Sequence, residues 1–290
     1  MHYVKAKAIL SAKNGMNIYR GCSHGCIYCD SRSVCYGMEH DFEDIEVKEN
    51  AVELLEDALK RKRKKCMIGT GSMTDPYIPA EMEIGNVRKV LSLIHKYGFG
   101  FTVITKSDRI LRDLDLLKKI HKRTKCVVQM TLTTYDEELC QKLEPNVCTT
   151  KDRFDVLLQL RDAGIPTVVW LCPILPFIND TKENIDGVLD CCIEANVRGI
   201  ICFGMGMTLR KGSREYFYRQ LDRLFPGMKE KYIRTYGTQY VLNSPDSKNL
   251  MELFRRKCAQ RGIMHDSQEI FAYLHTFENR QADKQLSLFG

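Results

Sequence analysis

The sequence of 290 residues predicts an α/β fold, a partial (β/α)6 TIM-like barrel with a helical C-terminal extension. Short apolar, β-branched runs alternate with longer amphipathic segments, which is the pattern of repeated βα units around a parallel sheet. Each short run is soon followed by polar residues, glycine or proline. The composition, 44% hydrophobic and 28% charged, provides for a full hydrophobic core and excludes disordered and fibrous proteins.

Six strands and five helices account for the barrel in chain order. The strands are expected at residues 16–19, 66–71, 101–105, 127–132, 167–171 and 199–203. The helices are expected at residues 51–60, 86–95, 110–121, 151–163 and 181–195. Gly164 follows the fourth helix, where a glycine is suited to end it. Six units are fewer than the eight of a closed barrel, so the predicted barrel is incomplete.

Three regions follow from this pattern. Residues 1–210 are expected to form the barrel, 211–278 an extension packed on it, and 279–290 a flexible tail. The segment 213–265 is predicted to be helical with an irregular middle at 232–247. In parallel α/β barrels the functional groups follow the C-terminal ends of the strands, so the residues after each strand are the first candidates for a site.

The cysteine content points to metal or redox chemistry rather than to disulfides. No segment has the length of a signal h-region or a membrane span, so we expect a cytoplasmic protein with no membrane partner. In that compartment thiols stay reduced, and clusters among the 13 cysteines indicate metal ligands or catalytic thiols. The net charge of +7 permits a nucleic-acid partner but is common in other proteins too.

One cysteine cluster has the spacing of a metal site. Cys22, Cys26 and Cys29 form a Cys-x3-Cys-x2-Cys pattern in a glycine-punctuated loop directly after the first predicted strand. Three thiolates bind three irons of a cubane cluster and leave the fourth iron open. A structural zinc site is the alternative, but it requires four closed ligands, and no second Cys-x2-Cys pair lies nearby.

The triplet and its position after the first strand resemble the radical S-adenosylmethionine (SAM) superfamily, over roughly residues 16–203. The resemblance implies a 4Fe-4S cluster bound by Cys22, Cys26 and Cys29. It also implies that the open iron chelates SAM, and that reduction yields a 5'-deoxyadenosyl radical that abstracts hydrogen from a substrate. In such enzymes the protein supplies orientation and exclusion of water, and an external electron donor is required.

Further segments resemble the spore photoproduct lyase branch of that superfamily. They are Thr105-Lys106-Ser107, Thr131, Leu143-Glu144-Pro145, and Arg153 in the following helix. The resemblance implies that Lys106, Thr131 and Arg153 belong to the SAM site. A small-residue stretch after the second strand implies the same for Gly69, Gly71 and Ser72, because small residues allow close backbone approach. Asp75 and Glu81 are expected to add carboxylates at the same mouth.

Two departures from that branch concern hydrogen transfer. Ser72 stands opposite the lyase's hydrogen-donating cysteine, and a serine O–H does not replace a weak S–H bond easily. Tyr28 matches one of the lyase's two relay tyrosines, but Asp30 occupies the position of the other. Cys172, at the end of the fifth predicted strand, is the candidate for an alternative hydrogen donor, and a buried strand-end cysteine is its structural interpretation.

The C-terminal pentapeptide resembles the motif by which bacterial replication and repair proteins bind the DNA sliding clamp. Its candidate contacts are Gln285 through amide hydrogen bonds and Leu286, Leu288 and Phe289 through apolar contact, after a polar linker. Packing of these apolar residues back onto the barrel is the alternative. Basic and aromatic residues after the sixth strand, Arg210 and Arg214 among them, suit phosphates and bases but also a solvated helix.

These features lead to one functional expectation and two alternatives. The expectation is a radical SAM enzyme that acts on DNA, for repair or modification, and is recruited by the sliding clamp. The first alternative is a radical SAM enzyme for a small molecule, a peptide or RNA. The second is a non-catalytic iron-sulfur or zinc protein that uses its tail as a clamp adaptor.

Overall fold

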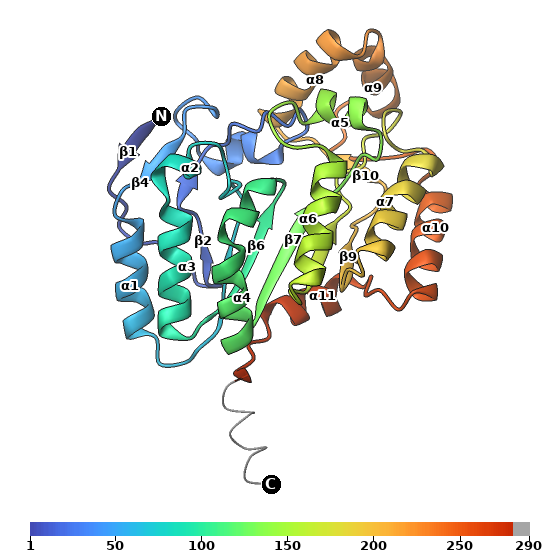
Figure 1. Cartoon of the computed structure of the whole chain (residues 1–290). Coiled ribbons are helices and arrows are strands. Elements are labelled where there is room, and N and C mark those ends of the chain that lie inside the picture. The colour runs from blue at the N-terminus through green and yellow to red at the C-terminus, as the bar shows by residue number, and fades with distance from the viewer. Residues whose placement is uncertain (281–290) are drawn as a thin grey trace.

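A six-stranded parallel sheet forms the centre of the computed structural model, which describes residues 1–280 (Figure 1). Its strand order is β2-β5-β6-β7-β8-β9. The strands are β2 (Gly15–Met16), β5 (Met67–Thr70), β6 (Gly100–Thr105), β7 (Cys126–Thr131), β8 (Thr167–Trp170) and β9 (Gly199–Ile201). All neighbours run parallel, so their C-terminal ends share one edge. This confirms the predicted partial (β/α)6 barrel.

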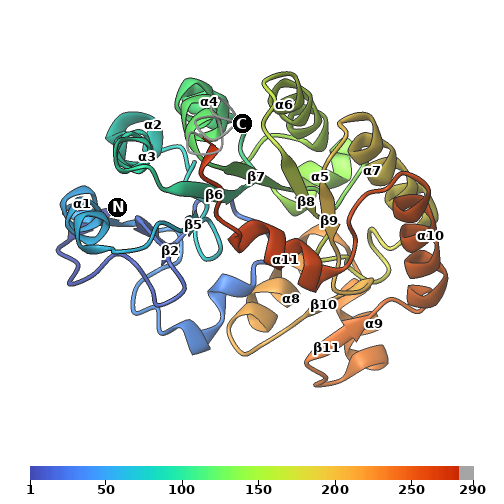
Figure 2. The same cartoon turned by 90° about the horizontal axis from the view of Figure 1, so that it is seen from below.

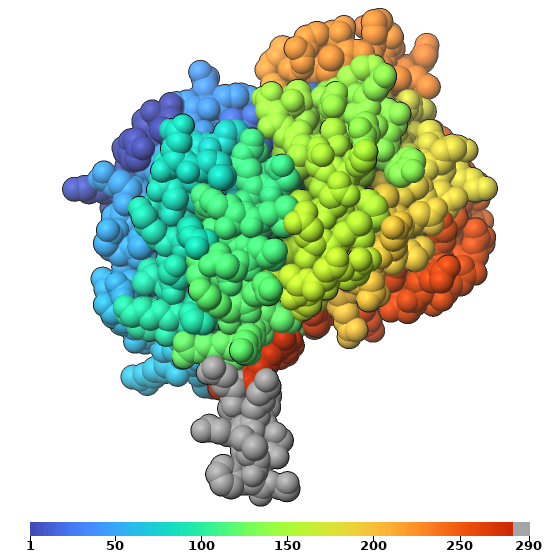
Figure 3. Space-filling model, in the orientation of Figure 1, coloured from blue at the N-terminus to red at the C-terminus, as the bar shows by residue number. Residues whose placement is uncertain are grey.

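Amphipathic helices cover the outer face of the sheet (Figure 3). They are α1 (Ala51–Arg61), α3 (Asn86–Tyr97), α4 (Leu114–Arg123), α6 (Thr150–Asp162) and α7 (Lys182–Glu194). In α1 the buried residues are Ala51, Leu55 and Leu59, a four-residue spacing that places them on one face. A short helix, α2 (Glu81–Ile84), precedes α3, and a 3-10 turn, η3 (Asp108–Asp113), precedes α4.

The inner side of the sheet is filled from below by the helix α11 (Ser267–His275) (Figure 2). Ile270 and Leu274 of α11 form a buried cluster with Val127, Val168 and Ile201 of the three last strands. Because β7 has helices on its outer side and α11 on its inner side, all six of its residues are buried. The preceding helix, α10 (Ser247–Gln260), packs beside α7.

A helical cap lies at the edge where the strands end (Figure 1). It contains α5 (Glu137–Leu143), α8 (Ser213–Leu224), α9 (Met228–Tyr236) and the antiparallel pair β10 (Gly206–Thr208) and β11 (Val241–Asn243). Its apolar core includes Leu143, Phe217 and Tyr232, and it also holds Cys26 and Ile27 of the cysteine loop. The cap therefore fixes the cysteine loop over the sheet.

A second, small sheet lies beside the first strand, in the order β1-β4-β3. It consists of β1 (His2–Val4), β4 (Glu46–Lys48) and β3 (Tyr19–Arg20). Between β3 and β4 the chain forms the cysteine loop and two 3-10 turns, η1 (Asp30–Arg32) and η2 (Val34–Tyr36). The small sheet thus anchors both ends of the segment that carries the cysteine triplet.

Three boundaries differ from the prediction. The expected strand 16–19 is wrong as a single strand, because the chain leaves the large sheet after Met16 and joins β4 at Tyr19. The expected irregular segment 232–247 begins as helix α9, which runs to Tyr236, and then continues into β11. The helix expected from residue 110 starts as the 3-10 turn and becomes α-helical at Leu114. No helix in the described part of the chain is long and apolar enough to span a membrane.

Gly71, directly after β5, provides a test of how closely the strand ends approach each other. Its φ is +97°, and a Cβ there would lie 2.0 Å from the carbonyl oxygen of Ile104. Replacement Gly71→Ala should lower the free energy of unfolding by about 3 kcal/mol or more, from backbone strain and a backbone clash. Urea denaturation measures this.

The matched control is Gly85→Ala. Gly85 also has a positive φ, +69°, but no atom lies within 4 Å of the added Cβ. The Gly85→Ala replacement should lower the free energy of unfolding by only about 1 kcal/mol, which is the penalty of the left-handed conformation alone. Equal losses in the two variants would show that the strand ends are free to separate.

Candidate functional site

A cavity of about 400 Å³ opens at the C-terminal edge of the large sheet. Its wall is built by the ends of β6, β7 and β8, the loops after β5 and β9, the cysteine loop and the β10–β11 pair. This is the edge at which parallel α/β folds place their sites, and the volume is in the range of ordinary ligand pockets. Lining residues predicted from the sequence are Tyr28, Cys29, Gly71, Ser72, Lys106, Thr131 and Cys172.

The cysteine loop is held by backbone hydrogen bonds and by two glycines. The N–H of Cys22 donates to the carbonyl of Phe42 at 3.0 Å, and the N–H of Asn146 donates to the carbonyl of His24 at 3.1 Å. Gly21 and Gly25 have φ values of +86° and +72°, which other residues rarely adopt. A Cβ on Gly21 would also lie 2.6 Å from the Phe42 oxygen.

The three cysteines supply the thiol donors of an iron-sulfur cluster; Cys26 is buried, and Cys22 and Cys29 are partly buried. Burial, followed by the charge of Asp75, raises the pKa of the Cys22 thiol to about 12. Burial also raises the pKa of Cys26 well above its usual value, and the charges of Cys29 and Cys22 add to it. Such thiols ionise readily only beside a compensating positive charge, which iron provides. The donor set and its environment therefore fit the cluster.

Lys106 and Thr131 lie at the ends of neighbouring strands and both line the cavity. Burial lowers the pKa of the Lys106 ammonium, but the negative charges of Cys26 and Glu144 outweigh it, and the net pKa is raised. Lys106 therefore stays protonated and can pair with a carboxylate as a point charge. Gly69 lies within β5 rather than at its end and is not among the lining residues, so its predicted contact is not formed at this cavity.

Arg153 does not reach the cavity. Its side chain is fully buried and pairs with Glu144, which also accepts a hydrogen bond from the Tyr28 hydroxyl. The guanidinium donates further to the carbonyls of Thr131 at 3.1 Å and Cys148 at 2.7 Å. The predicted direct contact of Arg153 with SAM is therefore corrected: Arg153 positions the residues behind the site.

The two carboxylates expected at the mouth also have their partners within the protein. Asp75 accepts hydrogen bonds from the Thr105 hydroxyl at 2.8 Å and from the Lys106 N–H at 2.7 Å. Glu81 is fully buried, where it accepts from Tyr19 and pairs with Arg112 at 2.7 Å. Asp75 thus joins the ends of β5 and β6, and Glu81 is a structural residue.

Cys172 lines the cavity at the end of β8. Burial raises the pKa of its thiol to about 12, so the sulfur keeps its hydrogen at neutral pH. A retained S–H bond is the chemical requirement for a hydrogen-atom donor. Ser72 lines the same cavity.

Two aromatic residues of the cavity were not among the predicted site residues. Trp170 ends β8, and Phe203, two residues after β9, is 64% exposed although it is large and apolar. Their ring centroids lie 5.9 Å apart, and Phe203 stacks on Phe271 of α11 at 6.3 Å. In the sequence both look like the last apolar residues of buried strands. Phe203 differs from a core residue only by its exposure, and Trp170 is half-buried.

Two basic residues beyond the sixth strand, Arg210 and Arg214, form hydrogen bonds within the protein. Arg214 donates to the carbonyls of Leu209 at 2.9 Å and Gln239 at 2.5 Å. Arg210 donates to the Tyr240 hydroxyl at 2.7 Å and lies 3.6 Å from Asp30, which lines the cavity. These arginines hold the cap together, and the charge of Arg210 is paired with Asp30 at the rim. The predicted clamp-binding residues, Gln285, Leu286, Leu288 and Phe289, lie outside the described residues.

Comparisons with known proteins agree with this architecture. Residues 16–222 match the radical SAM superfamily. An uncharacterized protein of Mycobacterium tuberculosis is 28% identical over 242 residues, which cover 81% of this chain and 71% of the relative. The radical SAM Nalpha-GlyT isomerase of Pseudomonas phage M6 is 26% identical over 157 residues, 54% of this chain and 32% of that protein.

Solved structures of spore photoproduct lyase share the fold. A mutant of that enzyme superposes with a TM-score of 0.66 at 14% identity, over 91% of this chain and 80% of the lyase. Its complex with a dinucleoside spore photoproduct gives a TM-score of 0.62 at 15% identity, over 86% and 74%. Since the family match covers most of the chain, the protein belongs to the radical SAM superfamily. The cofactors of this family are a 4Fe-4S cluster and SAM.

The buried ion pair behind the site leads to a stability prediction. Glu144→Gln leaves the Arg153 charge buried without its partner, and the free energy of unfolding should fall by about 3 to 5 kcal/mol. Chemical denaturation of the wild type and the variant measures the loss. Glu138→Gln, on the exposed side of α5, is the control and should change stability by less than about 0.5 kcal/mol. A loss below about 1 kcal/mol for Glu144→Gln would contradict the coupling of the two charges.

Proposed function

We propose that the protein is a radical SAM enzyme that binds its cluster through Cys22, Cys26 and Cys29 and acts on a nucleobase in DNA. The observation that carries the proposal is one cavity that joins the cysteine loop, the lysine and threonine at the strand ends, and an aromatic pair of which Phe203 is exposed and Trp170 half-buried. When bound, the reduced cluster cleaves SAM and supplies a 5'-deoxyadenosyl radical for hydrogen abstraction.

The chain's own residues bind and orient SAM. Lys106 offers its ammonium to the SAM carboxylate, and the Thr131 hydroxyl offers a hydrogen bond to a polar SAM atom. Gly71 and Ser72 leave space for SAM on this side of the cavity, because neither has a side chain large enough to fill it. Arg153 and Glu144 hold Tyr28 and the end of β7 in place from behind.

Hydrogen return to the substrate is assigned to Cys172. It is a cavity-lining thiol that stays protonated, whereas Ser72 offers only a strong O–H bond. Tyr28 also lines the cavity, but its hydroxyl donates a hydrogen bond to Glu144. Burial raises the pKa of Tyr28 well above the usual value. Tyr28, which matches a relay tyrosine of the lyase branch, is therefore a poorer first donor than Cys172. Donation of the hydrogen atom leaves a thiyl radical on Cys172, and one electron from the external donor together with a proton restores the S–H bond.

A DNA substrate is supported by the aromatic pair and by the rim charge. Phe203 offers an exposed ring face beside Trp170, which suits stacking of a base that has left the duplex. Arg210 lies beside the rim, where its guanidinium is paired with Asp30 at 3.6 Å and is 38% exposed, so a phosphate can compete for it. Among proteins of the same fold, spore photoproduct lyase has been solved with a dinucleoside lesion. Recruitment by the sliding clamp through the C-terminal pentapeptide remains a prediction from the sequence.

The cluster assignment is tested by anaerobic reconstitution with iron and sulfide. Cys22→Ala, Cys26→Ala and Cys29→Ala should each lose the cluster absorption and form no 5'-deoxyadenosine from SAM and dithionite, because each removes one of three iron ligands. Cys35→Ala is the control, since Cys35 is an exposed cysteine a few residues further along. An intact cluster that never cleaves SAM would favour the adaptor alternative.

The substrate assignment is tested by Phe203→Ala. Loss of one stacked base should weaken binding of a fluorescein-labelled, thymine-rich oligonucleotide by about 5-fold to 150-fold, measured by anisotropy on the SAM-loaded protein. Formation of 5'-deoxyadenosine without substrate should stay at the wild-type rate. Tyr3→Ala is the control, because Tyr3 is also exposed, at 56%, but lies on β1 away from the cavity.

Two outcomes would redirect the proposal. Equal oligonucleotide affinity in wild type and Phe203→Ala would remove the stacking role. Failure of the wild type to bind single-stranded or duplex DNA, with SAM cleavage intact, would favour RNA, a peptide or a small molecule as the substrate.

A further inference from the structure

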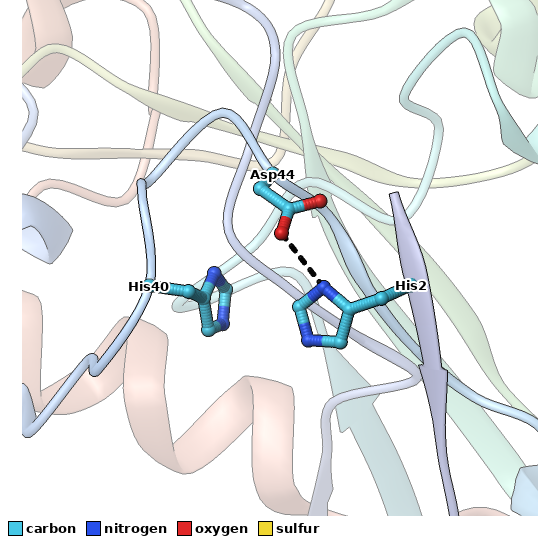
Figure 4. Close-up of side chains that lie close together, drawn as sticks. All are labelled: His2, His40 and Asp44. Atoms are coloured by element: carbon cyan, nitrogen blue, oxygen red, sulfur yellow. Dashed lines mark hydrogen bonds and ion pairs between the residues drawn. The ribbon is translucent and has the colours of Figure 1, made fainter.

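Three metal-ligating side chains cluster beside the small sheet, away from the cavity, and a fourth lies next to one of them. His2, His40 and Asp44 offer nitrogen and oxygen atoms that lie within 4.8 Å of one another (Figure 4). His2 comes from β1, and the other two come from the loop before β4. Glu46 of β4 is the register partner of His2, so both side chains lie on the same face of the strand pair. The Glu46 Oε2 lies 3.7 Å from the His40 Nε2.

The hydrogen bonding of His40 indicates the protonation state of its Nε2 atom. Its Nδ1 lies 2.9 Å from the carbonyl oxygen of Asp41, which can only accept, so Nδ1 carries a proton. In the neutral ring Nε2 then holds a lone pair, and this atom is buried without a hydrogen-bond partner. It faces the Glu46 carboxylate, which is also an acceptor. Two acceptors that face each other in this way leave room for a positive charge between them, either a proton on His40 or a metal ion.

The other pair completes a set of four ligands. The His2 Nδ1 lies 2.8 Å from the Asp44 Oδ2, and the two imidazole rings are 4.8 Å apart at 85°. The second oxygen of Asp44 lies 2.6 Å from the amino group of Met1. The Met1 ammonium already compensates part of the Asp44 charge. Imidazole nitrogens and carboxylate oxygens are donors that bind zinc. The carbonyl of Asp41 orients His40 as outer partners of metal-bound histidines do.

We propose that His2, His40, Asp44 and Glu46 form a structural site for a divalent transition metal of the zinc type. Four protein ligands leave no open position, which is typical of a structural rather than a catalytic zinc site. The loop that carries His40 and Asp44 also carries Phe42, whose carbonyl accepts the N–H of Cys22 at 3.0 Å. The metal therefore fastens the loop that supports the first cysteine of the cluster loop.

The test counts zinc on the full-length protein after its cluster has been reconstituted, so that the cluster cysteines are already occupied. The protein is incubated anaerobically with Zn²⁺, desalted and analysed by mass spectrometry for zinc and iron. One zinc per chain is expected in the wild type, and a loss of at least tenfold in zinc affinity is expected in His40→Ala and in Glu46→Gln. Hydrogen exchange of residues 37–45 should slow when zinc is added to the wild type only.

The control variant is His275→Ala, an exposed histidine on α11, which should keep the zinc. Glu46→Gln retains the shape of the side chain and keeps the test valid if His40→Ala fails to fold. The proposal is overturned if the wild type holds no zinc after desalting, in which case a proton on His40 joins it to Glu46. It is also overturned if zinc remains in both variants and disappears only when Cys22 is replaced.

Discussion

The buried ion pair between Glu144 and Arg153 is the interaction on which the site depends. Neither charge reaches solvent, so each is stable only because the other is present. Through this pair α6 is joined to the segment after α5, to the end of β7 and, by the Tyr28 hydroxyl, to the cysteine loop. Four segments that are distant in the sequence therefore meet around one pair of charges, directly behind the cavity.

The cavity itself is divided into two chemical halves. One half carries the cysteine loop, Lys106 and Thr131 and is suited to charged, polar atoms. The other half carries Trp170, Phe203 and the β10–β11 pair and is suited to a planar ring. Cys172 lies in the wall of the same cavity. A radical formed from a cofactor in the polar half would need to travel only within this cavity to meet a ring and a hydrogen donor.

The sequence predicted those features that depend on local pattern. The six strands, the outer helices and the cysteine triplet are encoded by short-range periodicity and spacing. Arg153 and Glu81 were misassigned because a partner far away in the chain, Glu144 or Arg112, occupies each of them, and such pairs leave no local signal. Phe203 looks like a core residue in the sequence, because its exposure arises from tertiary packing, where the cap does not cover it. The split between β2 and β3 arises from competition between two sheets for one short segment.

Helix α11 fills the lower opening of the barrel with Ile270 and Leu274. Small molecules therefore reach the cavity from the edge where the strands end and not through the floor that Ile270 and Leu274 close. If the substrate is the nucleic acid strand proposed above, that strand lies across the mouth through which the cofactor enters. Steady-state turnover would then follow a compulsory order, with the cofactor first to arrive and the strand first to leave.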